Sequence, residues 1–293
     1  MIIYKTKMKR APDPDNSIRV GSVRTLLDAL EKMQLDSSKV LFFRGHQSHT
    51  FEIKPSIYRD DGWIANEDIL FKELILRCPN EFAGMASTFQ MLVKMQHYSL
   101  PTRLLDVTLN PLIALFFACI DAENGESGEV VPFSVPTREI KYFDSDTVSV
   151  ISNLSRRPKK FEVGQGDSVS DFNKSQQGKL LLHEIRQEKP YFEPKIEPQH
   201  LRSAVFVKPK LENARILRQD GAFLLFGISG HKMQPAEISP SYLAYPEKKR
   251  IIITDKKKVR SQLESLGVTQ GSIFPEIDKV AEYIRAKFRS SID

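Results

Sequence analysis

The stretch that decides the fold is QHYSLPTRLLDVTLNPLIALFFACI, residues 96–120, where polar side chains run directly into one of the most apolar segments of the chain. Asn110 is a good helix N-cap, and Pro111 suits the first helical position. The apolar residues that follow occupy nearly all faces, which predicts a buried helix. Because the residue before Pro101 avoids the α region, we expect the preceding helix to end near Tyr98.

The polar loop between these two helices contains candidate binding residues. A buried arginine or aspartate must be paired, since an unpaired buried charge is costly. Arg103 and Asp106 are therefore either a salt-bridged brace for the loop or part of a ligand site. Thr108 and Asn110 stand where side chains cap the next helix, whose free first-turn amides would also accept an anion.

Two neighbouring features admit both a structural and a functional interpretation. His97 and Tyr98 lie at a helix end, where such a pair commonly makes ordinary hydrogen bonds. Arg44 ends an expected strand and precedes Gly45, whose missing side chain lets another group approach the backbone. The guanidinium fork of Arg44 suits a carboxylate or a pyrophosphate, and a structural ion pair is the alternative.

Outward from this stretch, helical and strand patterns predict one α+β domain. Residues 18–34 and 66–89 have helical spacing, the latter interrupted by Pro79, and residues 40–45 predict a strand. Residues 145–180 are rich in Ser, Asn, Gln and Gly, which indicates a long loop or an insertion with its own short elements. Further strands are expected at 130–136, 203–209, 221–227 and 250–254, and helices at 256–267 and 275–288.

Length and composition are those of a globular protein, because 41% of the 293 residues are hydrophobic and 27% are charged. Without an internal repeat or a clear linker, we expect a single domain over residues 1–293. Cys78 and Cys119 are too few for a disulfide scaffold, and no Cys/His spacing predicts a metal site. These features favour the cytoplasm.

No membrane association is expected. The N-terminus lacks an apolar region of signal-peptide length, and the apolar run at 111–120 is about half what a membrane-spanning helix needs.

The net charge of +6 makes an anionic partner plausible, because positive charge attracts polyanions at long range. Basic residues gather at 156–160 and 248–260, where they would neutralise phosphates of RNA or DNA. A solvated surface is the simpler interpretation of such runs. Aromatic residues do not interleave with them, so no base-stacking surface is indicated.

Several motifs together resemble the FRG domain family, which is named for its Phe-Arg-Gly motif, here Phe43, Arg44 and Gly45. The resemblance runs from about residue 20 to 288, and the long QHYSLPTRLLD motif is its most specific part. Ser99 departs from the glycine that the family commonly has there, and residues 140–200 match poorly. The motifs are FFRGH at 42–46, PSIYR at 55–59, QHYSLPTRLLDVTLNPLIALFFA at 96–118, RILRQDGAF at 215–223 and SIFPEIDKVAEYI at 272–284.

A weaker resemblance is to mono-ADP-ribosyltransferases, whose Arg, Ser-Thr-Ser and Glu motifs follow in a similar order. It implies a mixed or antiparallel split sheet flanked by helices, with NAD as substrate. Arg44 would hold the NAD diphosphate, and His97, Tyr98 and Thr108 would shape the nicotinamide-ribose pocket. The remaining cofactor-binding candidates are Phe43, Gly45, Thr102, Arg103 and Asn110.

The third motif of that family is incomplete here, because residues 215–219 offer no glutamate. Cleavage of NAD passes through an oxocarbenium-like state that a carboxylate stabilises. Asp106 and Gln219 are the preferred substitutes, with Asp220 and Glu184 as further candidates. The catalytic candidates are therefore Arg44, His97, Asp106 and Gln219.

The resemblance implies an intracellular toxin or anti-phage effector that transfers ADP-ribose to a nucleic acid or a protein. A toxin would have a neutralising antitoxin protein as partner. Two alternatives remain open: a non-catalytic sensor that binds a nucleotide or nucleic acid, and a phosphate-directed nuclease that uses His97.

Overall fold

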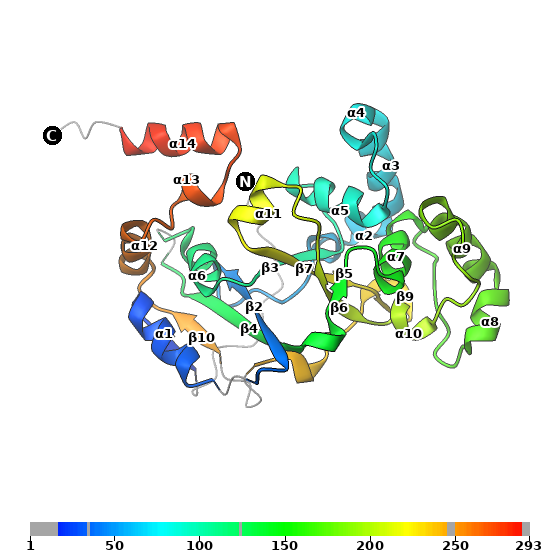
Figure 1. Cartoon of the computed structure of the whole chain (residues 1–293), viewed down its shortest axis with the longest axis horizontal. Helices are drawn as coiled ribbons and strands as arrows, with labels where there is room; N and C mark the ends of the chain where they lie inside the picture. The colour runs from blue at the N-terminus through cyan, green and yellow to red at the C-terminus, as the bar shows by residue number, and fades with distance from the viewer. Residues whose placement is uncertain (1–16, 34–35, 123–124, 245–249, 289–293) are drawn as a thin grey trace.

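The computed structural model describes residues 17–33, 36–122, 125–244 and 250–288. Its centre is one eight-stranded mixed sheet of order β1-β10-β4-β2-β3-β7-β6-β5, flanked by helices (Figure 1). Only the outermost pairs, β1 with β10 and β5 with β6, are parallel. The strands are β1 Ile18–Val20, β2 Lys39–His46, β3 Leu104–Thr108, β4 Gly128–Pro136, β5 Lys141–Tyr142, β6 Ala204–Lys208, β7 Gly221–Phe226 and β10 Ile251–Ile253, with a separate hairpin of β8 Ile228–Ser229 and β9 His231–Pro235.

Helices cover the sheet and form a lobe beside it, in which α8 and α9 lie farthest from the sheet (Figure 1). The α-helices are α1 Val23–Glu31, α2 Asp61–Ala65, α3 Glu67–Arg77, α4 Pro79–Phe82, α5 Thr88–His97, α6 Pro111–Cys119, α7 Asp146–Ser152, α8 Val169–Lys174, α9 Gln176–Glu188, α10 Pro198–Leu201, α11 Ala214–Arg218, α12 Lys256–Ser265, α13 Gln270–Ile273 and α14 Ile277–Lys287. Short 3-10 turns are η1 Ser56–Arg59, η2 Thr137–Glu139, η3 Asn153–Arg156 and η4 Pro240–Tyr242.

Strand pairing in the sheet is least extensive between β2 and β3. These strands share the single registered pair Phe43 and Thr108, whereas β2 and β4 pair along the whole of β2. Beyond Phe43 the strands diverge, and Nη1 of Arg44 donates to the carbonyl oxygen of Asp106 at 2.6 Å. We call the junction of β2 and β3, where Arg44 bonds to Asp106, the seam. The sheet is thus continuous in its hydrogen-bonded order, with two halves joined only at the seam.

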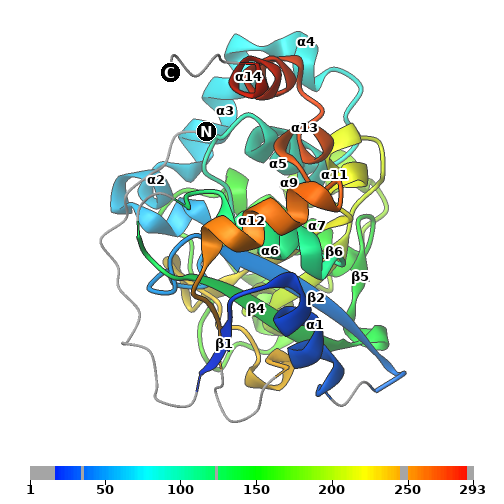
Figure 2. The ribbon, with the colours of Figure 1, turned by 90° about the vertical axis from the view of Figure 1, so that its left-hand side faces the viewer.

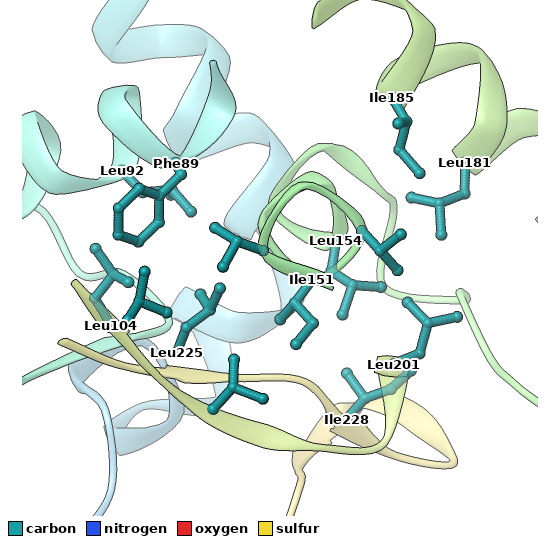
Figure 3. Packing of buried hydrophobic residues seen from close by; sticks show 14 of the residues in the cluster. Phe89, Leu92, Leu104, Ile151, Leu154, Leu181, Ile185, Leu201, Leu225 and Ile228 are labelled. Atoms are coloured by element: carbon teal, nitrogen blue, oxygen red, sulfur yellow. The ribbon is translucent and has the colours of Figure 1, made fainter. Parts of the chain in front are cut away.

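Three apolar clusters hold the layers together. The first lies between α5, α7, α9 and the β3-β7-β6 half of the sheet, and Figure 3 shows Phe89 and Leu92 of α5 close to Leu104 and Leu225 of the strands. The second lies under α1, α6 and α12 against the other half, with α12 crossing near α6 in Figure 2. The third lies on the opposite face, beneath η1 and α2.

Helix α6 is buried on most sides, as its sequence predicts, and Oδ1 of Asn110 accepts a hydrogen bond from the amide of Leu112 at 3.0 Å. The helix lies directly on the β2 backbone at Gly45. A Cβ atom at Gly45 would be 1.9 Å from the carbonyl oxygen of Ala114 and 2.7 Å from the amide nitrogen of Ala118. The glycine of the Phe-Arg-Gly motif is therefore required for the packing of this helix on the sheet.

One segment differs from the sequence-based expectation, and in another the structure decides between two alternatives. Residues 18–20, expected as the start of a helix, form β1 because they pair with β10 at the sheet edge. Residues 145–180, expected as a long loop or as an insertion with its own short elements, do form short elements, namely α7, η3, α8 and the start of α9, and they contribute to the first cluster. Their serines mark helix starts: Ser145, Ser168 and Ser175 cap α7, α8 and α9 through side-chain hydrogen bonds to backbone amides.

Arg103 is fully buried and pairs with Glu67 of α3, not with Asp106. Its Nε donates to Glu67 at 2.9 Å and its Nη1 to the carbonyl of Phe226 at 2.8 Å, while Nζ of Lys232 lies 3.1 Å from Glu67. Burial alone would raise the pKa of Glu67, but the two cations outweigh it and hold that pKa below its usual value. Arg103 thus braces α3 against the sheet.

Helix α5 ends at His97, as expected, and Ser99 beyond it has a φ of 64°. The amide of Ser99 donates to the carbonyl of Gln96, and that of Leu100 to the carbonyl of Met95, which is the hydrogen-bond pattern of a Schellman motif. The left-handed residue of that motif is usually glycine. Glycine adopts this backbone conformation without steric cost, whereas serine does not.

Replacing Gly45 with alanine is expected to lower the free energy of unfolding by about 3 kcal/mol, since the new methyl group meets helix backbone that cannot rotate away. Urea unfolding followed by circular dichroism measures this. Gly166→Ala is the matched control, because a Cβ atom there has no neighbour within 4 Å. Equal unfolding midpoints for the two variants would contradict the packing described for α6.

Ser99→Gly is expected to raise the free energy of unfolding by a few tenths to about 1 kcal/mol, because glycine adopts a positive φ without steric cost but also gains freedom in the unfolded chain. Ser99→Val should lower stability, since a branched side chain disfavours this conformation. Thermal melts of the three proteins should rank them glycine, serine, valine. Any other order argues against a left-handed residue 99.

Candidate functional site

A groove of about 530 Å³ opens between the α4–α5 region, the segment around α11 and the connection from α13 to α14. Its floor includes the apolar side chains of Phe89, Val93 and Ile216. An inner cavity of about 50 Å³ continues from it toward β3 and β7. Its lining includes Asp106 of β3 and Phe223 of β7. The polar and aromatic residues of the groove and cavity include Gln96, His97, Tyr98, Asp106, Arg215, Gln219 and Glu276.

The closest charged contact in the groove joins His97 and Glu276. Nε2 of His97, the last residue of α5, lies 2.7 Å from Oε1 of Glu276, and Nη1 of Arg215 lies 3.6 Å from the same oxygen. Both carboxylate oxygens are shielded from solvent. The contact with His97 is short but does not have hydrogen-bond geometry, so neither oxygen accepts a hydrogen bond in the described part of the chain. Arg215 also stacks over Phe274 at 5.1 Å, which holds it beside the carboxylate.

Tyr98 and Thr102 have different surroundings at the end of α5. Tyr98 is 59% exposed at the groove, with its ring edge-on to that of His97 at 5.0 Å between centroids. Thr102 is buried, and its hydroxyl donates to the side chain of Gln96. Tyr98 is therefore open to a ligand, whereas Thr102 fastens the loop to α5.

The end of β3 is fixed by hydrogen bonds to the segment after α11. The hydroxyl of Thr108 donates to the carbonyl of Gln219 at 2.6 Å and accepts from the amide of Asn110 at 3.0 Å. Nδ2 of Asn110 donates to Asp220 at 3.2 Å, and Nε2 of Gln219 donates to the carbonyl of Ile273 at 3.3 Å. Thr108 thus fixes the backbone of Gln219 in the cavity wall, Asn110 holds the neighbouring Asp220, and the side chain of Gln219 connects the segment to α13.

Two arginines lie near one another at the seam, on β2 and η1. Besides its bond to Asp106, Arg44 donates from Nε to Nε2 of His46 at 3.0 Å, and Arg59 donates to the carbonyl of Lys54 at 3.1 and 3.3 Å. Burial lowers the pKa of Arg44 to about 10, with a contribution from the charge of Arg59 that Asp106 opposes. Burial likewise lowers the pKa of Arg59.

Arg44 and Arg59 are half-buried, and no carboxylate of the described residues lies within ion-pair distance of either, whereas the buried cations Arg103, Lys232 and Arg250 are paired. The neighbouring His46 adds no charge at neutral pH, because burial lowers its pKa to about 4 despite its contact with Glu129. Its Nε2 accepts from Arg44, which leaves Nδ1 facing Glu129 at 3.4 Å. The seam therefore carries two positive charges that the protein leaves without direct neutralisation.

The structure brings together His97, Tyr98, Asp106 and Gln219 in the groove and its inner cavity. Arg44 lines neither, but it is joined to the cavity through its hydrogen bond to the carbonyl of Asp106. The remaining predicted residues lie within the packed structure: Phe43 in the second cluster, Gly45 under α6, Thr102 in the loop, Arg103 in its ion pair, and Thr108 and Asn110 in the bonds to α11.

Sequence reasoning missed Arg59, Arg215 and Glu276 as site residues. Each lies in a quoted family motif, namely PSIYR, RILRQDGAF and SIFPEIDKVAEYI. Their place in those motifs was the available signal, but nothing in sequence spacing brings Glu276 beside His97.

The basic runs do not form one uniformly free surface. Arg156 and Arg157 lie 3.1 and 3.5 Å from Glu184, and Arg250 lies 2.7 Å from Glu129. Lys159, Lys160 and Lys258 are exposed, Lys256 is buried, and Lys248 and Lys249 lie outside the described residues.

Within the described ranges, no group of three or more His, Cys, Asp or Glu residues is arranged to hold a metal ion. None of the helices in these ranges combines the length and apolar character that crossing a membrane requires.

Comparison with known proteins gives one match. The FRG domain family model matches residues 39–127, which span β2 through α6 and include Arg44, Arg59, His97 and Asp106. No curated protein and no solved structure matches the chain. The match covers the Phe-Arg-Gly motif and the long motif that ends in α6. Residues 39–127 of the chain are therefore identified as an FRG domain.

Proposed function

We propose that this protein is an NAD-dependent ADP-ribosyltransferase that acts in the cytoplasm as a toxin or anti-phage effector. The observation that carries the proposal is the pair Arg44 and Arg59 at the seam, two neighbouring guanidinium groups with no ion-paired carboxylate among the described residues. They lie next to a cavity that reaches Asp106.

Like charges held together in a partly buried place are costly unless an anion neutralises them. The diphosphate of NAD carries two negative charges and offers oxygen acceptors to two planar forks of donors. Arg44 is held in place by Asp106 and His46, so its guanidinium is oriented before a ligand binds. This arrangement favours a dinucleotide over a neutral ligand.

The seam also supports the ADP-ribosyltransferase-like fold that the motif order implies. There the strand carrying the arginine separates from the strand carrying Thr108. In that fold NAD would lie along the seam, with its diphosphate at Arg44 and Arg59 and its nicotinamide end toward Asp106, His97 and Gln219. Asp106 is exposed, so its carboxylate is available to stabilise the oxocarbenium-like state.

The acceptor in this proposal is a nucleic acid or a protein. Exposed lysines at 159, 160 and 258 would supply contacts to phosphates, although the arginines of the same runs are engaged in ion pairs. A neutralising antitoxin would cover the groove or the seam.

One observation favours a non-catalytic NAD sensor as the second candidate. The segment at 215–219 has no glutamate, and the hydroxyl of Thr108 is engaged in hydrogen bonds within the protein. Such a sensor would bind NAD at the same arginines without releasing nicotinamide.

Arg59→Gln is expected to weaken NAD binding at least tenfold, because a charge-assisted hydrogen bond to phosphate contributes about 1.5–3 kcal/mol. Isothermal titration calorimetry with NAD measures the Kd, and nicotinamide release and transfer of labelled ADP-ribose to RNA, DNA and protein acceptors measure turnover. Arg59 is the better probe than Arg44, whose side chain also holds β3.

The matched control is Arg77→Gln, since Arg77 is exposed on α3 and pairs only with Glu73. Its NAD affinity should equal that of the wild type. Tight NAD binding without turnover would favour the sensor over the transferase. A wild-type protein that does not bind NAD, or equal affinity in the two variants, would rule out the proposed site.

A further inference from the structure

We propose that His97 and Glu276 form an acid–base pair that activates the acceptor in the transfer reaction, with His97 as catalytic base and Glu276 as positioning residue. This inference rests on the proposed function and assigns a role to a glutamate outside the segment that the family model matches. It is carried by the geometry of the groove.

The first support is the contact between the two side chains. Nε2 of His97 lies 2.7 Å from the Glu276 carboxylate, so the two side chains are in contact although the hydrogen bond between them is not formed in this structure. A base that is held by a carboxylate at one nitrogen can take a proton at the other, and the carboxylate stabilises the imidazolium that results. In the described part of the chain, Nδ1 of His97 has no hydrogen-bond partner, so it is available for this step.

The second support is the state of the Glu276 carboxylate. Its two oxygens are shielded from water and have no hydrogen bond within the described ranges, although a carboxylate accepts several. A buried acceptor without donors is costly in a purely structural glutamate. The cost is offset when a positive imidazolium forms beside it, which is the state that proton transfer creates.

The third support is position. His97 lines both the groove and the inner cavity, so it faces the outer space where an acceptor enters and the inner wall formed by Asp106 and Gln219. The charged and titratable groups of the groove and cavity that face His97 are Glu276, Arg215, Lys94, Tyr98 and Asp106, with Lys210 and Glu212 on the groove wall.

In the transfer step, the acceptor hydroxyl or amine gives its proton to Nδ1 of His97 while its heteroatom forms a bond to the ribose anomeric carbon. The bond from that carbon to the nicotinamide nitrogen breaks, and its electron pair stays on the nicotinamide ring. His97 afterwards releases the proton to water. Arg215, 3.6 Å from Glu276, offsets part of the carboxylate charge and stacks on Phe274.

The test measures three variants: Glu276→Gln, His97→Gln and the double variant that carries both changes. The control is Glu282→Gln. Glu282 is a matched control on α14, because it is half exposed and pairs with Lys279. General-base catalysis contributes about 10²–10⁴-fold, so His97→Gln should slow single-turnover transfer by that factor. Glu276→Gln should slow it about ten- to a hundredfold, and the double variant should be no slower than His97→Gln, since the two act as a unit.

Two further readouts separate this role from a structural one. The NAD Kd should stay within about threefold in Glu276→Gln and Glu282→Gln, because neither side chain is assigned a contact with NAD. Glu276→Asp, which keeps the carboxylate, should recover part of the transfer rate that Glu276→Gln loses, because the acid–base role requires a carboxylate beside His97.

The outcomes distinguish the two proposals. Transfer by the wild type with an unchanged rate in Glu276→Gln, or without recovery in Glu276→Asp, overturns the pair and leaves the transferase standing. Additive losses in the double variant also overturn the pair. A wild type that binds NAD but neither releases nicotinamide nor transfers ADP-ribose overturns both.

Discussion

The close packing of α6 on the β2 backbone is the constraint on which the rest of the structure depends. The carbonyl of Ala114 lies where a side chain at Gly45 would be, so the helix and the strand meet without a side-chain layer between them. This contact fixes the end of β2, and Arg44 is the residue next to it. Because α6 begins at Pro111, shortly after β3 ends at Thr108, the same packing also sets the distance between β2 and β3.

The seam is the consequence of that arrangement. One registered pair joins the halves of the sheet, and the backbone carbonyl of Asp106 that would otherwise lack a partner accepts from Arg44. A side chain thus replaces the missing strand hydrogen bond, which makes Arg44 part of the sheet as well as a candidate anion ligand. The arginines at the seam are positively charged, and the Glu276 carboxylate in the groove is negatively charged. In the proposed reaction the arginines would contact phosphate, and Glu276 with His97 would contact the proton donor.

Much of the fold follows from local pattern. The buried helix after Asn110, the strands at 40–45, 130–136, 203–209 and 221–227, and the ends of α5 and α12 are all confirmed. The pattern was misleading at 18–20, where sheet pairing outweighs helical spacing. At 145–180 the expected short elements are present as helices that serines cap, whereas the alternative of a long loop is not what the segment forms.

Only part of the candidate site could be predicted from local sequence patterns. His97, Asp106 and Gln219 could be found because they lie in distinctive motifs, and the structure brings them to one cavity. The partner of Arg103 could not be found, since Glu67 and Lys232 are distant in sequence and meet the arginine only through the packing of α3 and β9. Arg59 and Glu276 were likewise beyond reach, because a lone charged residue in a motif shows no partner.

By itself the sequence determined the helix ends, the strands, the FRG motif and the need to bury α6, because caps, prolines, glycines and hydrophobic spacing act over a few residues. Only the tertiary structure decided which charges are neutralised, which remain open at the seam, and that His97 meets Glu276. Those outcomes depend on contacts between segments far apart in the chain, and the free energy of a charge is set by everything packed around it.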